Sequence, residues 1–139
     1  MTPMVYEVLD EFKAAEDKAS VLRKYAGYYA FTTILEGAFH PNIHFSIKEL
    51  PPYNKIDVPP GMGYTNMTDA IHRIYLFVEG SNRVDPNLTQ ERKRQLLIQI
   101  LEALEPREAE VYGNVILKDL KVPGLTYELV KEVFPQMLP

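Results

Sequence analysis

Three histidines, His40, His44 and His72, are the residues of this sequence best suited to bind a transition metal. A zinc site needs three or four ligands in close geometry, and the chain has no cysteine to supply thiolates. Pro41 follows His40, so we do not expect His40 and His44 to share one face of a helix. We therefore expect no metal site and no cofactor. The lack of cysteine also excludes disulfides, a thiol redox centre and a cysteine nucleophile.

Carboxylates are plentiful, but their pattern does not predict catalysis. General acid–base chemistry needs a carboxylate in a partly desolvated cleft. Nearly all of the carboxylates fall instead on expected helix surfaces beside Lys or Arg, a pattern typical of solvated ion pairs. They are Glu7, Asp10, Glu11, Glu16, Asp17, Glu91, Glu102, Glu105, Glu108 and Glu110. The stretch "PPGMGYTN" lacks phosphate-loop spacing, and no nucleophile motif is present, so we expect no enzyme.

The basic residues suggest contact with phosphate as a second kind of chemistry. Taken singly, each is typical of a solvated surface charge, but a fold that gathers them could bind phosphates. Glycine and helix amides at 124–127 could add anion contacts. The net charge of −4 argues mildly against nucleic-acid binding without excluding a local basic face. The basic residues are Lys48, Lys55, Arg83, Arg92, Lys93, Arg94, Lys118, Lys121 and Lys131.

The elements that would position these residues are mostly helices. We expect residues 1–139 to form one all-α domain, with a short extended ribbon and a Pro/Gly-rich loop in the middle. Helical spacing of apolar residues covers 5–12, 21–25, 28–39, 71–78, 96–104 and 111–120. A last short helix is capped by Thr126 and ended by Pro135.

The middle of the chain has a different pattern. Ile43, Phe45 and Ile47 alternate with polar residues, which predicts a short strand or ribbon. Residues 51–66 contain four prolines and two glycines, which favours an ordered loop. The next two helices each have two candidate caps, Asn66 or Thr68 for one and Asn87 or Thr89 for the other.

No segment is expected to enter a membrane. The apolar runs are short and broken by charge, and the N-terminus lacks the order of a signal peptide. We expect a cytoplasmic protein, or a viral protein that acts in the host cytoplasm.

Four short motifs occur in an order that resembles the N-terminal α-helical DNA-binding domain of phage-type ATP-dependent DNA ligases. The resemblance runs from about Val5 to Pro139. The first three motifs are the aromatic–Ile–Lys segment at 45–48, the Thr68-Asp69 helix start and the basic turn at 83–87. The fourth is a C-terminal phrase formed by Asp119, Leu120, Lys121, Gly124, Phe134, Pro135, Leu138 and Pro139.

In those ligases this domain grips duplex DNA beside the nick and also mediates partner contacts. We expect the chain to correspond to this domain alone, without the nucleotidyltransferase and OB domains of the ligases. The resemblance therefore implies a non-catalytic, sequence-independent binder of duplex or nicked DNA, phage-encoded and linked to replication or repair. It implies DNA-facing positions at Arg83, Asn87, Lys118, Lys121, Gly124 and Thr126, and the neighbouring Lys48 and Lys131 complete the predicted set.

The chain also departs from the ligase pattern. Pro123 adds a residue before Gly124, and Glu132 replaces the usual lysine of the last helix. Asp85-Pro86 replaces Thr-Gly in the basic turn, and Gln136 replaces a glycine. These changes and the net charge favour an alternative function. The fold would then serve as a protein-interaction module, docking on polymerase or clamp machinery or a host factor, or forming part of the virion.

Overall fold

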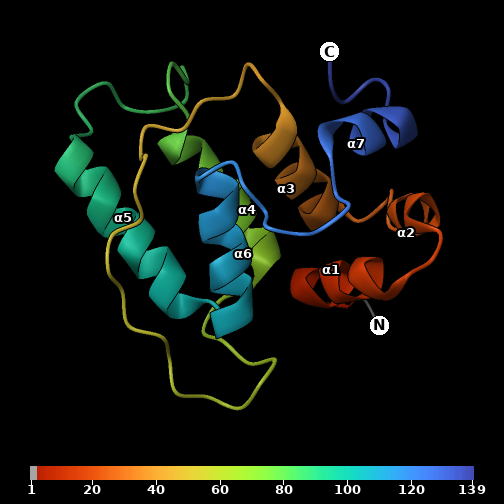
Figure 1. Cartoon of the computed structure of the whole chain (residues 1–139). Helices are drawn as coiled ribbons and strands as arrows, with labels where there is room; N and C mark the ends of the chain where they lie inside the picture. Colours follow the sequence, from red (N-terminus) through yellow and green to blue (C-terminus); the bar gives the residue numbers. More distant parts are fainter. Residues whose placement is uncertain (1–2) are drawn as a thin grey trace.

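Short helices joined by long irregular segments make up the computed structural model, which describes residues 3–139 (Figure 1). No strand occurs within these residues, so the predicted all-α fold class is confirmed. In chain order the elements are α1 (Val5–Ala14), α2 (Lys18–Lys24), α3 (Tyr29–Phe39), α4 (Met67–His72), the 3-10 helix η1 (Ile74–Phe77), α5 (Gln90–Ala103), α6 (Pro106–Ile116) and α7 (Tyr127–Val133).

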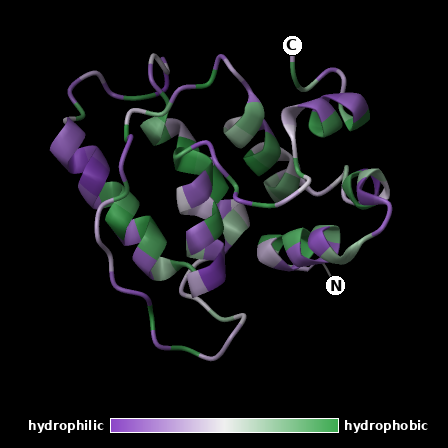
Figure 2. Cartoon of the chain, in the orientation of Figure 1, coloured by the Kyte–Doolittle hydropathy of each residue, from purple (hydrophilic) through white to green (hydrophobic). Residues whose placement is uncertain are grey.

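Helix α6 lies at the centre of the core. It packs against α1, α3, α4 and α5, and all of its residues from Val111 to Ile116 are buried. The Tyr112 hydroxyl donates a 3.1 Å hydrogen bond to the carbonyl of Ala70, which satisfies a polar group that water cannot reach. In Figure 2 the ribbon of α3 is largely hydrophobic, whereas the first half of α5 is hydrophilic and faces solvent.

Side-chain caps begin five helices of the described residues, namely α2, α4, α5, α6 and α7. Asn66 accepts from the amide of Asp69 at 2.9 Å and caps α4. Thr89 caps α5 and Thr126 caps α7, in each case through an amide three residues later. Of the paired candidates, Asn66 and Thr89 are therefore the caps. These positions were predictable because an N-cap is a local interaction.

Two predicted helices are shorter than their apolar spacing indicates. The helix after Asn66 ends at His72 and is followed by the 3-10 helix η1. At the end of η1 the Phe77 carbonyl accepts from the amide of Ser46 at 2.7 Å and so joins the extended segment. The helix predicted to reach Leu120 ends at Ile116 instead. It closes because Lys118 takes a left-handed conformation, with φ of 57°.

The predicted ribbon is an extended segment with a single bridge. Phe45 pairs with Val78 in one isolated antiparallel bridge, and no longer strand forms in the described residues. Phe45 and Ile47 are buried, while His44 and Lys48 are exposed. The alternation therefore predicted which side chains are buried, but the partner segment after η1 is too short to form a sheet.

Residues 51–66 contain no helix and cross the junction of α5 and α6. The amides of Tyr64 and Thr65 both donate to the carbonyl of Ala103, at 2.8 and 3.0 Å. Within residues 3–139, no helix has the length and apolar character needed to span a bilayer.

Gly63 should be intolerant of any side chain, because a Cβ there would lie 2.6 Å from the backbone nitrogen of Glu105. We expect Gly63→Ala to lower the free energy of unfolding by about 1–3 kcal/mol, since backbone cannot move aside as a side chain can. Urea denaturation measures this change. Gly27→Ala is the matched control, because within residues 3–139 no atom outside the neighbouring residues lies within 4 Å of a Cβ at Gly27. Equal stability of the two variants would contradict the packing argument.

Candidate functional site

The segment from Lys118 to Thr126, here called the α6–α7 turn, carries four of the eight predicted DNA contacts. Its backbone is unusual, because Lys118, Lys121 and Gly124 all have positive φ, at 57°, 57° and 82°. Non-glycine residues rarely adopt this conformation. These three positive φ angles give the turn a defined backbone shape, which fixes the positions of Lys118, Lys121 and Gly124.

Lys118 has a structural role rather than a free ammonium. Its Nζ donates to the carbonyls of Gly37, His40 and Ile43, at 2.9, 2.8 and 2.8 Å. An ammonium has three protons, so all of its donors are used within the fold. The side chain is half-buried, and burial, with a smaller effect of Lys48, lowers the pKa of Lys118 from its usual value. Lys118 is therefore poorly placed to bind phosphate.

The other predicted residues of the turn remain exposed. The side chain of Lys121 forms no hydrogen bond within the described residues. The backbone amide of Lys121 donates to the Asp119 side chain at 3.0 Å. Gly124 lies against Lys18, since a Cβ there would approach the Cδ of Lys18 to 3.1 Å. The Thr126 hydroxyl oxygen accepts from Leu129 as the α7 cap. Lys121 and the backbone at Gly124 are thus the accessible groups of this turn.

A hollow of about 80 Å³ beside the turn brings in a second lysine that the sequence did not suggest. We call it the turn hollow. Its charged and amide lining residues are Asp10, Lys13, Arg107, Glu110, Asn114 and Lys121. Arg107 binds Asp10 through two hydrogen bonds of 2.8 Å, which lowers the pKa of Asp10 below its usual range. Lys13, which comes from the last turn of α1, could not be paired with Lys121 from the sequence, because 108 positions separate them (121 − 13).

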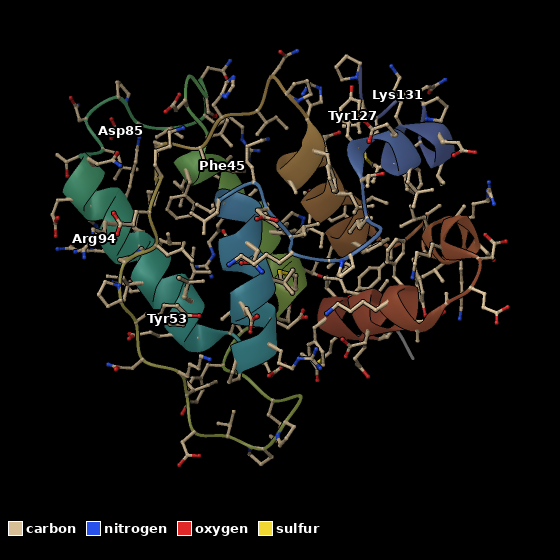
Figure 3. The ribbon with its side chains drawn as sticks, viewed as in Figure 1. Phe45, Tyr53, Asp85, Arg94, Tyr127 and Lys131 are labelled. Carbon is tan, nitrogen blue, oxygen red and sulfur yellow. The ribbon has the colours of Figure 1, made fainter. Side chains whose placement is uncertain are left out.

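Lys48 and Lys131 have partners within the fold. Lys48 forms a 3.4 Å ion pair with Glu79 at the surface. Lys131 donates to the Pro139 carbonyl at 2.7 Å, and the Tyr127 hydroxyl donates to the same oxygen. Figure 3 shows Tyr127 and Lys131 together on α7.

Arg83 and Asn87 lie in the loop before α5, apart from the α6–α7 turn. The Arg83 guanidinium lies 4.1 Å from the centre of the Tyr75 ring. Asn87 is exposed, and its amide donates to Asp85 at 2.9 Å. Figure 3 places Asp85, in the same loop, at the opposite side of the view from Lys131. The structure therefore separates the predicted contacts into the α6–α7 turn, the loop before α5, α7 and the extended segment that carries Lys48.

Two carboxylates predicted to be solvated are buried. Glu105 and Glu108 are 3% and 2% exposed. Glu108 accepts from the Tyr6 amide at 2.7 Å and so caps the N-terminus of α1 from another helix. Glu105 accepts from the Arg107 amide at 2.9 Å, while its Oε2 is buried without a hydrogen-bond partner in the described residues. For Glu108 the prediction was wrong because a charge pattern along one helix does not reveal the distant Tyr6 amide.

Burial raises the pKa of Glu108 to about 7. The amides of Tyr6 and Val5 act in the opposite direction, and the nearby charges of Glu105 and Glu7 raise the pKa further. Among residues 3–139, no cluster of three or more His, Cys, Asp or Glu is arranged to hold a metal ion.

The titration of Glu108 should make stability fall as pH rises. Because its pKa is about 7 in the folded chain and 4.5 in the unfolded chain, the folded state holds a proton between these values that the unfolded state has lost. Stability from this group is therefore full below pH 4.5 and is lost by about pH 7. Between pH 5 and pH 8 we expect the free energy of unfolding of Glu108→Gln to rise by about 2–3 kcal/mol relative to that of the unsubstituted protein.

Urea denaturation at several pH values measures this difference. Glu110→Gln is the matched control, because Glu110 lies on the same helix and is exposed. A Glu108→Gln difference that does not change with pH would show that the carboxyl titrates normally.

Comparison with known proteins gives a family but no function. The model of DUF6433, described as a family of unknown function, matches residues 5–122, which include all helices from α1 to α6. No curated protein matches the chain.

Proposed function

The chain belongs to the DUF6433 family, and we propose that it is a non-catalytic protein that binds duplex DNA without sequence preference. We further propose that it is phage-encoded, acts in the host cytoplasm and serves DNA replication or repair. The observation that carries the proposal is the convergence of Lys13 and Lys121 on the turn hollow, beside the exposed backbone of Gly124. The resemblance to the ligase domain also implies DNA contacts in this turn.

The chemistry of the turn suits phosphate rather than bases. Lysine is a compact point charge on a flexible stem, and it follows a phosphate without requiring a fixed base. Lys13 and Lys121 have no ion-pair partner in the described residues. Gly124 is exposed and has no side chain, so a DNA backbone could approach the turn closely. Lys18 beneath it adds positive charge, although its ammonium donates to three carbonyls at the end of α1.

The structure narrows the proposed contacts. We retain Lys121 and Gly124 from the predicted set and add Lys13. Lys118 contributes charge but no free donor, and the Thr126 side chain is used as a cap. The carboxylates of Glu110 and Asp10 also line the hollow, so the positive field is local and should be weak. We therefore expect modest affinity with strong salt dependence.

Substitution of both hollow lysines should weaken duplex binding and flatten its dependence on salt. For Lys13→Ala with Lys121→Ala, we expect the slope of log affinity against log salt to fall by about 2, because each lost phosphate contact removes about one released counterion. Fluorescence anisotropy with a labelled nicked duplex at low salt measures it. Lys55→Ala is the control, since Lys55 is exposed and lines no hollow beside the turn.

Two outcomes would remove the proposal. One is no binding to nicked or intact duplex at low salt. The other is binding that the double substitution leaves unchanged, because the contact would then lie elsewhere.

An interaction module for a protein partner is a second candidate function. It is favoured by α7, where Glu128 and Glu132 are exposed while Lys131 is engaged with Pro139. An acidic helix face repels DNA and suits a basic protein surface.

The second candidate predicts a stoichiometric complex with a replication, transcription or host protein that excess duplex does not displace. Co-purification followed by mass spectrometry identifies the partner, and Glu128→Lys with Glu132→Lys should release it. Retention of the partner by this variant would place the interface away from α7.

A further inference from the structure

Two adjoining hollows meet at Tyr29, which is 54% exposed and the first residue of α3. Together we call them the tyrosine groove. One, of about 580 Å³, is lined by Pro3, Lys24, Tyr25, Gly27, Tyr28, Tyr29 and Thr68. The other, of about 320 Å³, is lined by Tyr29, Thr33, Ile71, His72, Ile74, Tyr75, Val78 and Arg83. None of these residues belongs to the α6–α7 turn.

The lining of the tyrosine groove carries no carboxylate. This is unusual for a chain with 19 acidic residues and a net charge of −4. The charged side chains of the lining are cationic, Lys24 in one hollow and Arg83 in the other. Glu11 pairs with Lys24 at 2.9 Å and also accepts from Tyr25 at 2.6 Å, so Arg83 is the unpaired cation of this lining within the described residues. The groove is therefore complementary to an anion.

Aromatic rings provide the second property of the groove. The rings of Tyr29 and His72 lie 5.2 Å apart at an angle of 32°. At the far end, the Arg83 guanidinium lies over the Tyr75 ring at 4.1 Å, and it forms no ion pair within the described residues. Flat rings next to the unpaired Arg83 cation favour a ligand that is both planar and anionic.

We propose that the tyrosine groove binds single-stranded nucleic acid. Unpaired bases stack on Tyr29, the exposed ring of the groove, and the phosphates lie near Arg83. A charged groove with interleaved aromatic residues is the arrangement by which single strands are bound without sequence preference. In a duplex the base faces are covered by their neighbours, so these rings cannot reach them. An acidic polypeptide would satisfy the cations but would offer no repeated planar face.

The groove adds a site to the proposed duplex function and stands independently of it, because Lys13 and Lys121 line a different hollow. A protein with both sites would hold a duplex and an adjacent unpaired strand. Gapped or flapped DNA has this form.

The test uses the full chain and a fluorescein-labelled oligothymidylate in an anisotropy titration at low salt. We expect Tyr29→Ala to weaken binding by roughly 5- to 150-fold, the range for loss of one stacked base, and Tyr29→Phe to retain it. Arg83→Ala should weaken binding and reduce its salt slope by about 0.7. Tyr64→Ala is the matched control, because Tyr64 is 80% exposed and lines neither hollow. Thermal denaturation confirms that each variant is folded.

Three results would overturn the groove proposal. They are no binding of the oligothymidylate, equal effects of Tyr29→Ala and Tyr64→Ala, or binding of polyglutamate with the same affinity and the same dependence on Tyr29. The last result would assign the groove to an acidic protein segment. The duplex proposal is tested separately from the groove proposal. Lys13→Ala with Lys121→Ala should weaken duplex binding and leave the affinity for the oligothymidylate unchanged.

Discussion

The hydrogen bonds of Lys118 are the interaction on which the arrangement of the candidate site depends. Its ammonium joins the end of α3 to the start of the extended segment, through the carbonyls of Gly37, His40 and Ile43. The same residue ends α6 in a left-handed conformation, which costs a non-glycine residue about 1–2 kcal/mol. Three charge-assisted hydrogen bonds can offset that cost. Lys118 thereby fixes the direction in which the chain leaves the core toward Lys121.

Local signals in the sequence predicted local structure, and distant partners decided the rest. The caps at Thr89 and Thr126 were predictable because donor and acceptor are three residues apart. The end of η1 was not, because the Phe77 carbonyl pairs with the Ser46 amide, 31 residues earlier. The burial of Glu108 could not be predicted for the same reason, since its amide partner at Tyr6 is 102 residues away. From sequence alone, a charged residue on a helix is predicted to be solvated unless its distant hydrogen-bond partner is known.

The candidate sites were predictable to different degrees. The C-terminal phrase located the α6–α7 turn and Lys121, but it could not indicate that Lys118 is used internally or that Lys13 lines the same hollow. The tyrosine groove was missed because residues 28–39 have the composition of a buried helix. That pattern holds from Ala30 onward, but Tyr29 lies where the helix begins and remains half exposed. Helix ends leave the core at an angle that periodicity alone does not give.

The net charge of −4 bears differently on the two proposed sites. Charge far from a contact is screened within about 8 Å at physiological ionic strength, so the total matters less than the groups within that distance. At the turn hollow those groups include Asp10 and Glu110, and the attraction to phosphate is therefore reduced at every salt concentration. In the tyrosine groove the lining has no carboxylate, and stacking adds attraction that salt screens little. A partly acidic chain can thus hold a nucleic acid only where its fold turns the carboxylates away, as it does along the lining of the tyrosine groove.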